Sequence, residues 1–314
     1  MDGSVSTVDT TWQAGHNPDR ETDSETISMM RRLHLIEIHE QSWFPSSLRD
    51  YVTAALQFGF NLFKVYTPAV PLLQRVLDST GGTSIIDMCS GGGGPWLHLG
   101  RTLQSKDLAS GAPGIQIWLT DKYPNLGASP KVPMSVKMSA SKSADMSGNL
   151  ITFYGSSVDA MSVPPELKGM RTMFTSFHHF APEEARAILQ NAVDAGESIG
   201  IFEVTGRALP TLAMVVTWAF LLSACTPWIR PFRWSRLFWT YLVPIIPLVL
   251  LFDGIVSCLR TYRPGELREM VAGLTANEYR WEIDEHSGGR PPVITYLIGY
   301  PRPRSVAPPG SRIA

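Results

Sequence analysis

The stretch that decides the fold is SIIDMCSGGGGP, residues 84–95. Its first half is a short apolar run typical of a buried strand, and its second half is a tight turn into a helix that Pro95 can begin. The backbone N–H groups of Gly91–Gly94 can approach a ligand closely because no side chain intervenes. The stretch therefore predicts a strand–loop–helix unit. Its loop is either a ligand site or simply a tight turn.

Apolar runs and helical patterns alternate on both sides of this loop. Further strands are expected at residues 116–121, 151–156, 171–176 and 197–205, and helices at 48–66, 95–104, 182–195 and 264–274. The last two expected strands, 279–285 and 293–300, are joined by too short a link for a parallel crossover, so they form an antiparallel hairpin. The pattern predicts an α/β fold with a doubly wound, mostly parallel, seven-stranded sheet, a C-terminal antiparallel hairpin, a helical hydrophobic insertion and N-terminal helices.

The glycine loop lacks the signatures of two common ligand classes. A phosphate loop ends in Gly-Lys-Ser/Thr, which is not found here. A dinucleotide fingerprint would need glycine where Trp96 stands, which disfavours a nicotinamide dehydrogenase. The remaining pattern is an acidic residue followed by small ones, Asp87-x-Cys89-x-Gly91-x-Gly93.

This pattern resembles the first motif of the class I S-adenosylmethionine-dependent methyltransferases, in a bacterial type with a hydrophobic hairpin insertion. Cys89 replaces the first glycine of the motif. Asp121, in IWLTDKYPN, matches the family's ribose-binding acid, and Asp159, in GSSVDAMSVP, matches its acid near adenine. The segment TSFHHF and the closing hairpin also fit. The resemblance covers about residues 80–206 and 262–301, and it implies a Rossmann-like fold with S-adenosyl-L-methionine as the cofactor.

The resemblance places ten residues at the cofactor. They are Asp87, Cys89, Ser90, Gly91, Gly93, Asp121, Lys122, Asp159, Ala160 and Ser176. Asp87 is expected to orient the loop and face the amino end of the cofactor. The carboxylate of Asp121 can accept two hydroxyl donors. A capping or turn role is the alternative for Asp121 and Asp159.

Candidate catalytic residues follow the fourth and fifth expected strands. His178 and His179 stand at the carboxyl edge, where open α/β sheets bind ligands. Some O-methyltransferases of the resembling family carry their catalytic histidine in a His-x-aromatic context, which His178-His-Phe180 matches. His178 is therefore the hypothetical general base, with Glu203 as a further candidate. For each, a structural role is the alternative.

Apolar residues concentrate in the insertion, residues 207–261. Residues 208–229 carry no charge and residues 237–259 carry only Asp253, so each is long enough for a spanning helix of roughly 20 residues. A basic, aromatic turn, residues 230–236, joins them. Three alternatives stay open: a membrane-spanning hairpin of transmembrane helices, a re-entrant or interfacial element, or a lid over an apolar acceptor.

Composition limits the other possibilities. The 314 residues hold 27 Lys+Arg against 28 Asp+Glu, and this balance disfavours a nucleic-acid partner. The three cysteines form no CxxC, so neither a disulfide framework nor a metal site is expected and a reducing compartment is favoured. The N-terminal residues do not have the pattern of a secretory signal.

The expected division of the chain has five parts. They are a tail at 1–28, an N-terminal helical cap at 29–79, an S-adenosylmethionine-binding domain at 80–206 and 262–301, the insertion at 207–261, and a tail at 302–314.

We expect a membrane-associated methyltransferase with its catalytic domain in the cytoplasm. Its acceptor is expected to be an apolar small molecule such as a lipid, a quinone or a polyketide. Membrane lipids are the expected partners, and the oligomeric state is open. The alternative is a membrane-anchored protein that binds the cofactor, or only keeps the fold, without catalysis.

Overall fold

The computed structural model describes residues 31–110, 114–124, 151–276, 279–286 and 292–302. The chain divides into residues 1–31 and residues 32–314, and the fold described below belongs to the second unit. The expected tails at 1–28 and 302–314 lie outside the described residues, except for Arg302.

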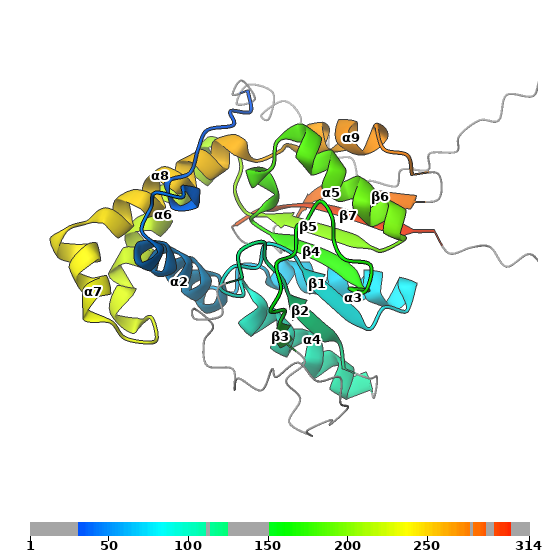
Figure 1. Cartoon of the computed structure of the whole chain (residues 1–314), viewed down its shortest axis with the longest axis horizontal. Helices are drawn as coiled ribbons and strands as arrows, with labels where there is room; N and C mark the ends of the chain where they lie inside the picture. Colours follow the sequence, from blue (N-terminus) through cyan, green and yellow to red (C-terminus); the bar gives the residue numbers. More distant parts are fainter. Residues whose placement is uncertain (1–30, 111–113, 125–150, 277–278, 287–291, 303–314) are drawn as a thin grey trace, which may run out of the picture. The chain divides into compact units, whose positions relative to one another are not determined.

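A seven-stranded sheet runs through this unit in the order β3-β2-β1-β4-β5-β7-β6 (Figure 1). Its strands are β1 Ser84–Asp87, β2 Gln116–Leu119, β3 Ile151–Phe153, β4 Met170–Phe174, β5 Ile199–Glu203, β6 Tyr279–His286 and β7 Ile294–Pro301. The first five strands pair in parallel, and β7 is antiparallel to both β5 and β6. The predicted fold class is confirmed. Asp87 pairs with Leu119 on β2 and with Thr172 on β4, so the carboxyl ends of these strands meet at one edge.

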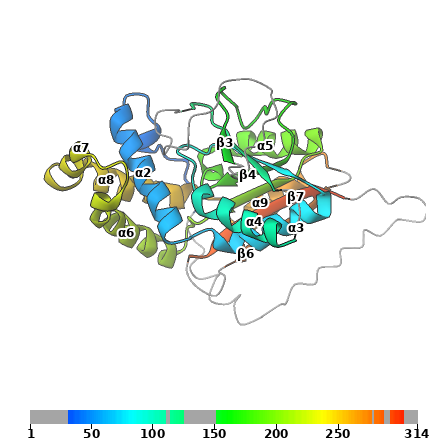
Figure 2. The ribbon, with the colours of Figure 1, turned by 90° about the horizontal axis from the view of Figure 1, so that it is seen from below.

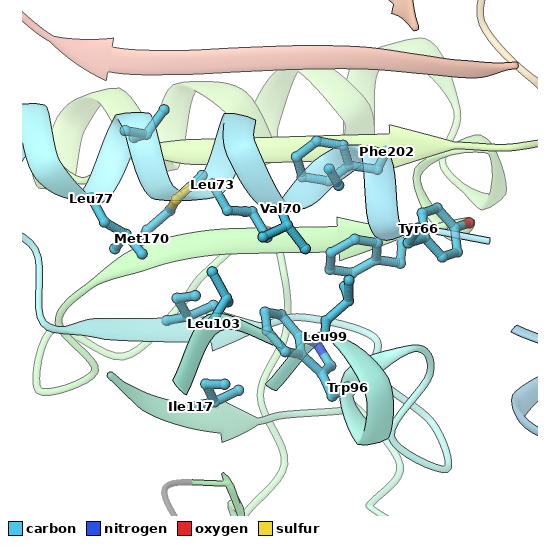
Figure 3. Close-up of a cluster of buried hydrophobic side chains, with 14 of the residues drawn as sticks. Tyr66, Val70, Leu73, Leu77, Trp96, Leu99, Leu103, Ile117, Met170 and Phe202 are labelled. Carbon is cyan, nitrogen blue, oxygen red and sulfur yellow. The ribbon is translucent and has the colours of Figure 1, made fainter. Parts of the chain in front are cut away.

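Helices cover both faces of the sheet (Figures 1 and 2). Helices α3 (Val70–Thr80) and α4 (Trp96–Ser110) pack on one face, where Leu73, Leu99 and Ile117 are fully buried (Figure 3). Helices α5 (Pro182–Ala195) and α9 (Pro264–Ala272) pack on the other face. The two apolar clusters fix the sheet as a rigid base for the loops at its carboxyl edge.

A third apolar cluster joins helices α2 (Ser46–Leu62), α6 (Leu209–Ala224) and α8 (Ile245–Arg260). Both views show these helices gathered at the same side of the sheet (Figures 1 and 2). Glycines allow the close approach, because a Cβ on Gly59 would lie 2.6 Å from Leu222 and one on Gly254 would lie 2.6 Å from Val215. Helix α2 therefore packs against the insertion as well as against the sheet unit.

The insertion differs from its sequence-based expectation. Neither apolar stretch is one long helix: α6 and α8 have 16 residues each, or about 24 Å, and a span needs about 30 Å. Prolines explain the breaks, since Pro227 lies in the 3-10 helix η5 (Thr226–Trp228) and Pro244 precedes α8.

Between these breaks lie α7 (Trp234–Leu237) and the π-helix η6 (Phe238–Leu242). Among the described residues no single helix has the length and apolar character to cross a bilayer. Residues 234–242 and 245–260 pass that test only as a pair, which is bent by 71°. The alternative of a hairpin of two transmembrane helices is not supported by these helices.

The N-terminal segment (residues 32–40) has no regular secondary structure up to the 3-10 helix η2 (Ile38–Glu40). It lies along the end of α8: the N–H of Leu33 donates to the carbonyl of Leu259 at 3.0 Å, and Arg32 Nε donates to the carbonyl of Arg260 at 2.6 Å. This path carries the acidic side chains of the segment to the carboxyl edge of the sheet.

Candidate functional site

The glycine loop has an unusual backbone. Cys89, Gly91, Gly93 and Gly94 all have positive φ, at 55°, 53°, 102° and 46°. A side chain in the left-handed region costs roughly 1–2 kcal/mol, so Cys89 occupies a position that favours glycine. This conformation accounts for the glycine that the first motif of class I methyltransferases has at the position of Cys89.

Helix α2 covers the loop. The amide of Gln57 donates to the carbonyl of Gly92, and Asn61 Nδ2 donates to the carbonyl of Gly94 at 2.8 Å. A Cβ on Gly93 would lie 3.3 Å from Gln57 Nε2. The loop is therefore held between β1 and a helix that the sequence assigned to the N-terminal cap.

The structure brings the expected ribose- and adenine-side residues together. Asp121 accepts two backbone N–H groups, that of Gly91 at 2.9 Å on Oδ2 and that of Tyr123 at 2.8 Å on Oδ1. Asp159 binds Lys122 Nζ at 2.8 Å, and this bond lowers the pKa of the Asp159 carboxyl. Asp121 thus links the end of β2 to the glycine loop. Lys122 links the end of β2 to the segment after β3. Asp121 and Asp159 each accept the backbone N–H two residues further on, which is the turn role expected as an alternative. This role is compatible with cofactor binding.

Asp87 lies deeper than a surface ligand. It is 1% exposed and accepts the hydroxyl of Thr172 at 2.8 Å. Burial raises the pKa of Asp87 to about 7, although the bond to Thr172 opposes the shift. The residue joins β1 to β4 beneath the loop, and its contact with the amino end of a cofactor stays a prediction.

Ser90, Ala160 and Ser176 are all buried near this edge. Ser90 Oγ donates to the carbonyl of Thr120 at 3.0 Å. Ser176 Oγ is buried and has no hydrogen-bond partner among the described residues. A buried hydroxyl without a partner is costly, so a ligand that forms a hydrogen bond with Ser176 would be favoured.

The candidate catalytic residues form one cluster. His178 Nδ1 lies 2.8 Å from Glu203 Oε2, while Glu203 Oε1 accepts the N–H of Phe177 at 2.8 Å. Both charged side chains are buried, with 1% of His178 and 4% of Glu203 exposed. The backbone bond fixes the carboxylate, and the carboxylate fixes the imidazole ring.

A second carboxylate faces the other side of the His178 ring. Glu37 Oε1 lies 3.5 Å from His178 Nε2, which has no hydrogen-bond partner among the described residues. Burial by itself lowers the pKa of His178, but the charges of Glu203 and Glu37 outweigh it and raise the pKa to about 9. Burial by itself raises the pKa of Glu37, but the nearby charges of His178, His179 and His39 outweigh it and hold this pKa well below its usual range. At neutral pH His178 is therefore protonated, and its imidazolium lies between the carboxylates of Glu203 and Glu37.

Further charged groups surround this pair. His179 Nδ1 bonds Glu40, and Arg260 lies 3.0 Å from Glu40 Oε2 and 3.5 Å from Glu37 Oε1. His39 Nδ1 lies 2.8 Å from Asp253 Oδ2, and this bond helps to raise the pKa of His39 against the effect of burial. His179 therefore binds a neighbouring acid, and His178 is the ring that is oriented by Glu203.

Five residues of this cluster were missed in the sequence: Glu37, His39, Glu40, Asp253 and Arg260. One available signal was the charge of Asp253 within the apolar run LLFDGIV. Another was the alternation of polar and apolar residues in LIEIHE, which ends at Glu40. Neither pattern shows that the two segments meet at His178.

A cavity of about 160 Å³ opens beside the cluster. Its polar end holds His178, His179, Glu37 and Asp253. Its apolar walls come from α2, α6 and α8, with Val52, Leu56, Phe60, Met214, Trp218 and Leu250. The insertion thus supplies a large share of the lining of a mainly apolar cavity that also contains charged side chains.

The cavity also touches a strained residue. Thr175, which follows β4 and lines the cavity, has a φ of 44°, and its hydroxyl bonds that of Tyr66. A β-branched residue in this region is rare, and such strain clusters at functional sites.

A metal ion is the other ligand that this cluster suggests. Glu37, His178 and His179 offer ligand atoms that lie within 4.8 Å of one another. The cation of Arg260 already lies 3.5 Å from Glu37, and Glu40 already binds His179. These charges compete with a metal ion, so we derive no metal chemistry from the cluster.

No protein-family model and no curated protein matches the sequence. Similar solved structures include an O-methyltransferase family protein from Burkholderia thailandensis, with a TM-score of 0.39 and 16% identity over 76% of this chain and 57% of that one. Human N-acetylserotonin methyltransferase in complex with SAM has a TM-score of 0.42 and 14% identity over 87% of this chain and 64% of that one.

A third is magnesium protoporphyrin IX methyltransferase from Synechocystis with bound SAH, at a TM-score of 0.39 and 13% identity over 82% of this chain and 99% of that one. These solved structures are methyltransferases, as the resemblance in the sequence implies. The chain spans 57% and 64% of the length of the first two structures.

Proposed function

We propose that this chain transfers a methyl group from S-adenosylmethionine to an apolar small molecule, such as a lipid, a quinone or a polyketide. One observation carries the proposal: helix α2 contacts the glycine loop and also lines the cavity. Thr53 and Gln57 contact the glycine loop, and Val52, Leu56 and Phe60 line the cavity above His178. A methyl donor at the loop and an acceptor in the cavity would be neighbours.

The residues present fit S-adenosylmethionine. The glycine loop offers a backbone without side chains, and the partly exposed carboxylates of Asp121 and Asp159 keep lone pairs for sugar hydroxyls. The unpartnered hydroxyl of Ser176 offers a further polar contact. The acidic surroundings also suit a ligand that carries a positive charge.

When bound, S-adenosylmethionine supplies a methyl group on a sulfonium cation. The chain's own task is alignment and proton handling. Glu203 holds His178 Nδ1, and the other ring nitrogen, Nε2, lies 3.5 Å from Glu37 Oε1, both residues lining the cavity. The neutral ring takes the proton of an acceptor hydroxyl at Nε2, and Glu203 stabilises the resulting imidazolium.

The apolar walls support the acceptor class. An engineered apolar cavity of about 150 Å³ binds benzene, so this cavity has room for roughly one ring or a short chain. The cavity's apolar walls and its charged side chains favour an apolar body with a single polar group. The exposed apolar side chains on α6 and α8 support action at a membrane.

Calorimetry of the full chain with S-adenosylmethionine tests the first half of this proposal. We expect saturable binding that Asp121→Ala abolishes. A chain that does not bind the cofactor keeps only the fold. Binding without methyl transfer to any lipophilic or polar extract would favour the alternative of a non-catalytic, membrane-anchored protein.

A further inference from the structure

The insertion exposes an unusual number of large apolar side chains. More than half of the exposed large hydrophobic residues among the described ones lie between Leu209 and Phe252. The most exposed are Trp234 at 78%, which begins α7, and Leu242 at 73%, which ends η6. We call the part of this surface from Trp228 to Leu242 the hairpin tip. Apolar surface gathered in this way marks an interaction site.

The charges of the hairpin tip have one sign. No Asp or Glu occurs in residues 204–252. Arg230 and Arg233 are exposed, and neither forms an ion pair with a described acidic residue. In contrast, Arg236 is buried and donates to the carbonyl of Ile229 at 3.0 Å. Two arginines thus remain available for an anionic partner beside exposed tryptophans.

This composition fits a lipid headgroup region better than a second copy of the chain. Tryptophan and tyrosine concentrate at bilayer interfaces, where their rings are half-solvated, and arginine binds phosphate groups bidentately. A twofold contact between two hairpin tips would bring like charges together without an acidic residue to balance them. The two helices that flank the tip in sequence, α6 and α8, also line the cavity with Met214 and Gly254.

We propose that the hairpin tip docks on the phosphate headgroups of an anionic bilayer, with Arg230 and Arg233 on the phosphates and Trp234 and Leu242 in the interface. This extends the membrane part of the proposed function. It does not depend on methyl transfer, because docking needs only the surface. The walls of the acceptor cavity would then lie at the membrane.

Vesicle co-sedimentation of the full chain tests this inference. The probes are phosphatidylcholine vesicles with and without about one third phosphatidylglycerol, at low and high salt. We expect binding only to the anionic vesicles, weakened by salt. The double variant Arg230→Glu/Arg233→Glu should bind at least about tenfold more weakly. Its matched control, Arg101→Glu/Arg186→Glu, reverses two exposed arginines elsewhere and should bind as the wild type does.

The apolar contact is tested with Trp234→Ser, whose side chain is too exposed for its loss to unfold the chain. We expect weaker vesicle binding, with Tyr123→Ser, at a side chain that is 81% exposed, as the control. Equal binding to neutral vesicles, or an equal loss in the control variants, would overturn the proposal. So would a wild-type dimer that binds no vesicles and that Trp234→Ser dissociates. Cofactor binding measured on the same samples separates this outcome from a failure of the methyl-transfer proposal.

Discussion

His178 lies between two carboxylates that are far apart in the sequence, Glu37 near the N-terminus and Glu203 at the end of β5. Its Nδ1 is 2.8 Å from Glu203 Oε2, and its Nε2 is 3.5 Å from Glu37 Oε1. Glu203 orients the ring, and Glu37 occupies the direction from which an acceptor hydroxyl would approach. Glu203 therefore orients the ring of His178, and the charges of Glu203 and Glu37 favour its protonated form.

This arrangement predicts the pH dependence of methyl transfer. With the pKa of His178 raised to about 9, the neutral base becomes abundant only as the pH approaches 9, so the rate should rise over that range. Glu37→Gln removes one negative charge from beside the ring, so the pKa of His178 falls and the rising limb moves to lower pH by about one unit or more. Initial rates from pH 6 to pH 10 measure the shift.

The control for this experiment is Glu269→Gln, which changes an exposed glutamate on α9 and should leave the profile unchanged. Superimposable profiles for Glu37→Gln and wild type would show that His178 does not act as the base.

Asp121 should contribute to cofactor affinity. Asp121→Asn keeps the shape of the side chain but loses the charge that would accept two sugar hydroxyls, so the affinity for S-adenosylmethionine should fall at least about tenfold. Calorimetry measures it, with thermal unfolding to confirm that the loss of the Gly91 contact has not opened the loop. Asp194→Asn, at an exposed position on α5, is the matched control. Unchanged affinity in the Asp121 variant would remove this residue from the cofactor site.

Asp87 should make stability depend on pH. Its pKa in the folded chain is about 7, above the ordinary 3.8, so the folded chain holds this proton more tightly than the unfolded chain does. The stability that this supplies is present below pH 4 and is lost as the pH rises through 7. Asp87→Asn should therefore stabilise the chain at pH 8, by up to about 4 kcal/mol, and by less at pH 5. Urea unfolding at the two pH values measures the difference, and an equal change at both would contradict the assignment.

Two neighbouring glycines offer a matched comparison. Gly93 has a φ of 102°, and a Cβ there would lie 3.3 Å from Gln57 and 3.4 Å from Leu119. Gly94 has a φ of 46°, and a Cβ there would meet nothing within 4 Å. Gly94→Ala should cost about 1 kcal/mol of unfolding free energy, whereas Gly93→Ala should cost clearly more. Equal losses in urea unfolding would show that the packing of α2 on the loop is not tight.

The sheet could be predicted from the sequence because its signals are local. Strand lengths, the glycine loop at Gly91–Gly94 and the helical period of Pro182–Ala195 each depend on neighbours in the chain, and the observed α5 has the predicted bounds. The antiparallel pairing of β6 and β7 was predicted from the short connection between them, which is too short for a parallel crossover. Local sequence patterns thus predicted the strands and helices, and also the parallel and antiparallel parts of the sheet.

The insertion and the polar cluster could not be predicted in the same way. Counting apolar residues in 208–259 overlooks the breaks at Pro227 and Pro244, which decide helix length. The cluster forms because Glu37 and Asp253 meet at His178, and such long-range contacts depend on packing rather than on periodicity. Glu203 was predicted because it ends a parallel strand, and His178 because it follows the neighbouring strand in a His-x-aromatic context.

Methyl-label transfer tests the central claim most directly. The full chain is incubated with methyl-labelled S-adenosylmethionine and either a lipid extract or a polar metabolite extract. The proposed function predicts label in an organic-soluble product, reduced at least about a hundredfold by His178→Gln. Label confined to polar products, or a cofactor-binding chain that labels neither extract, would contradict it.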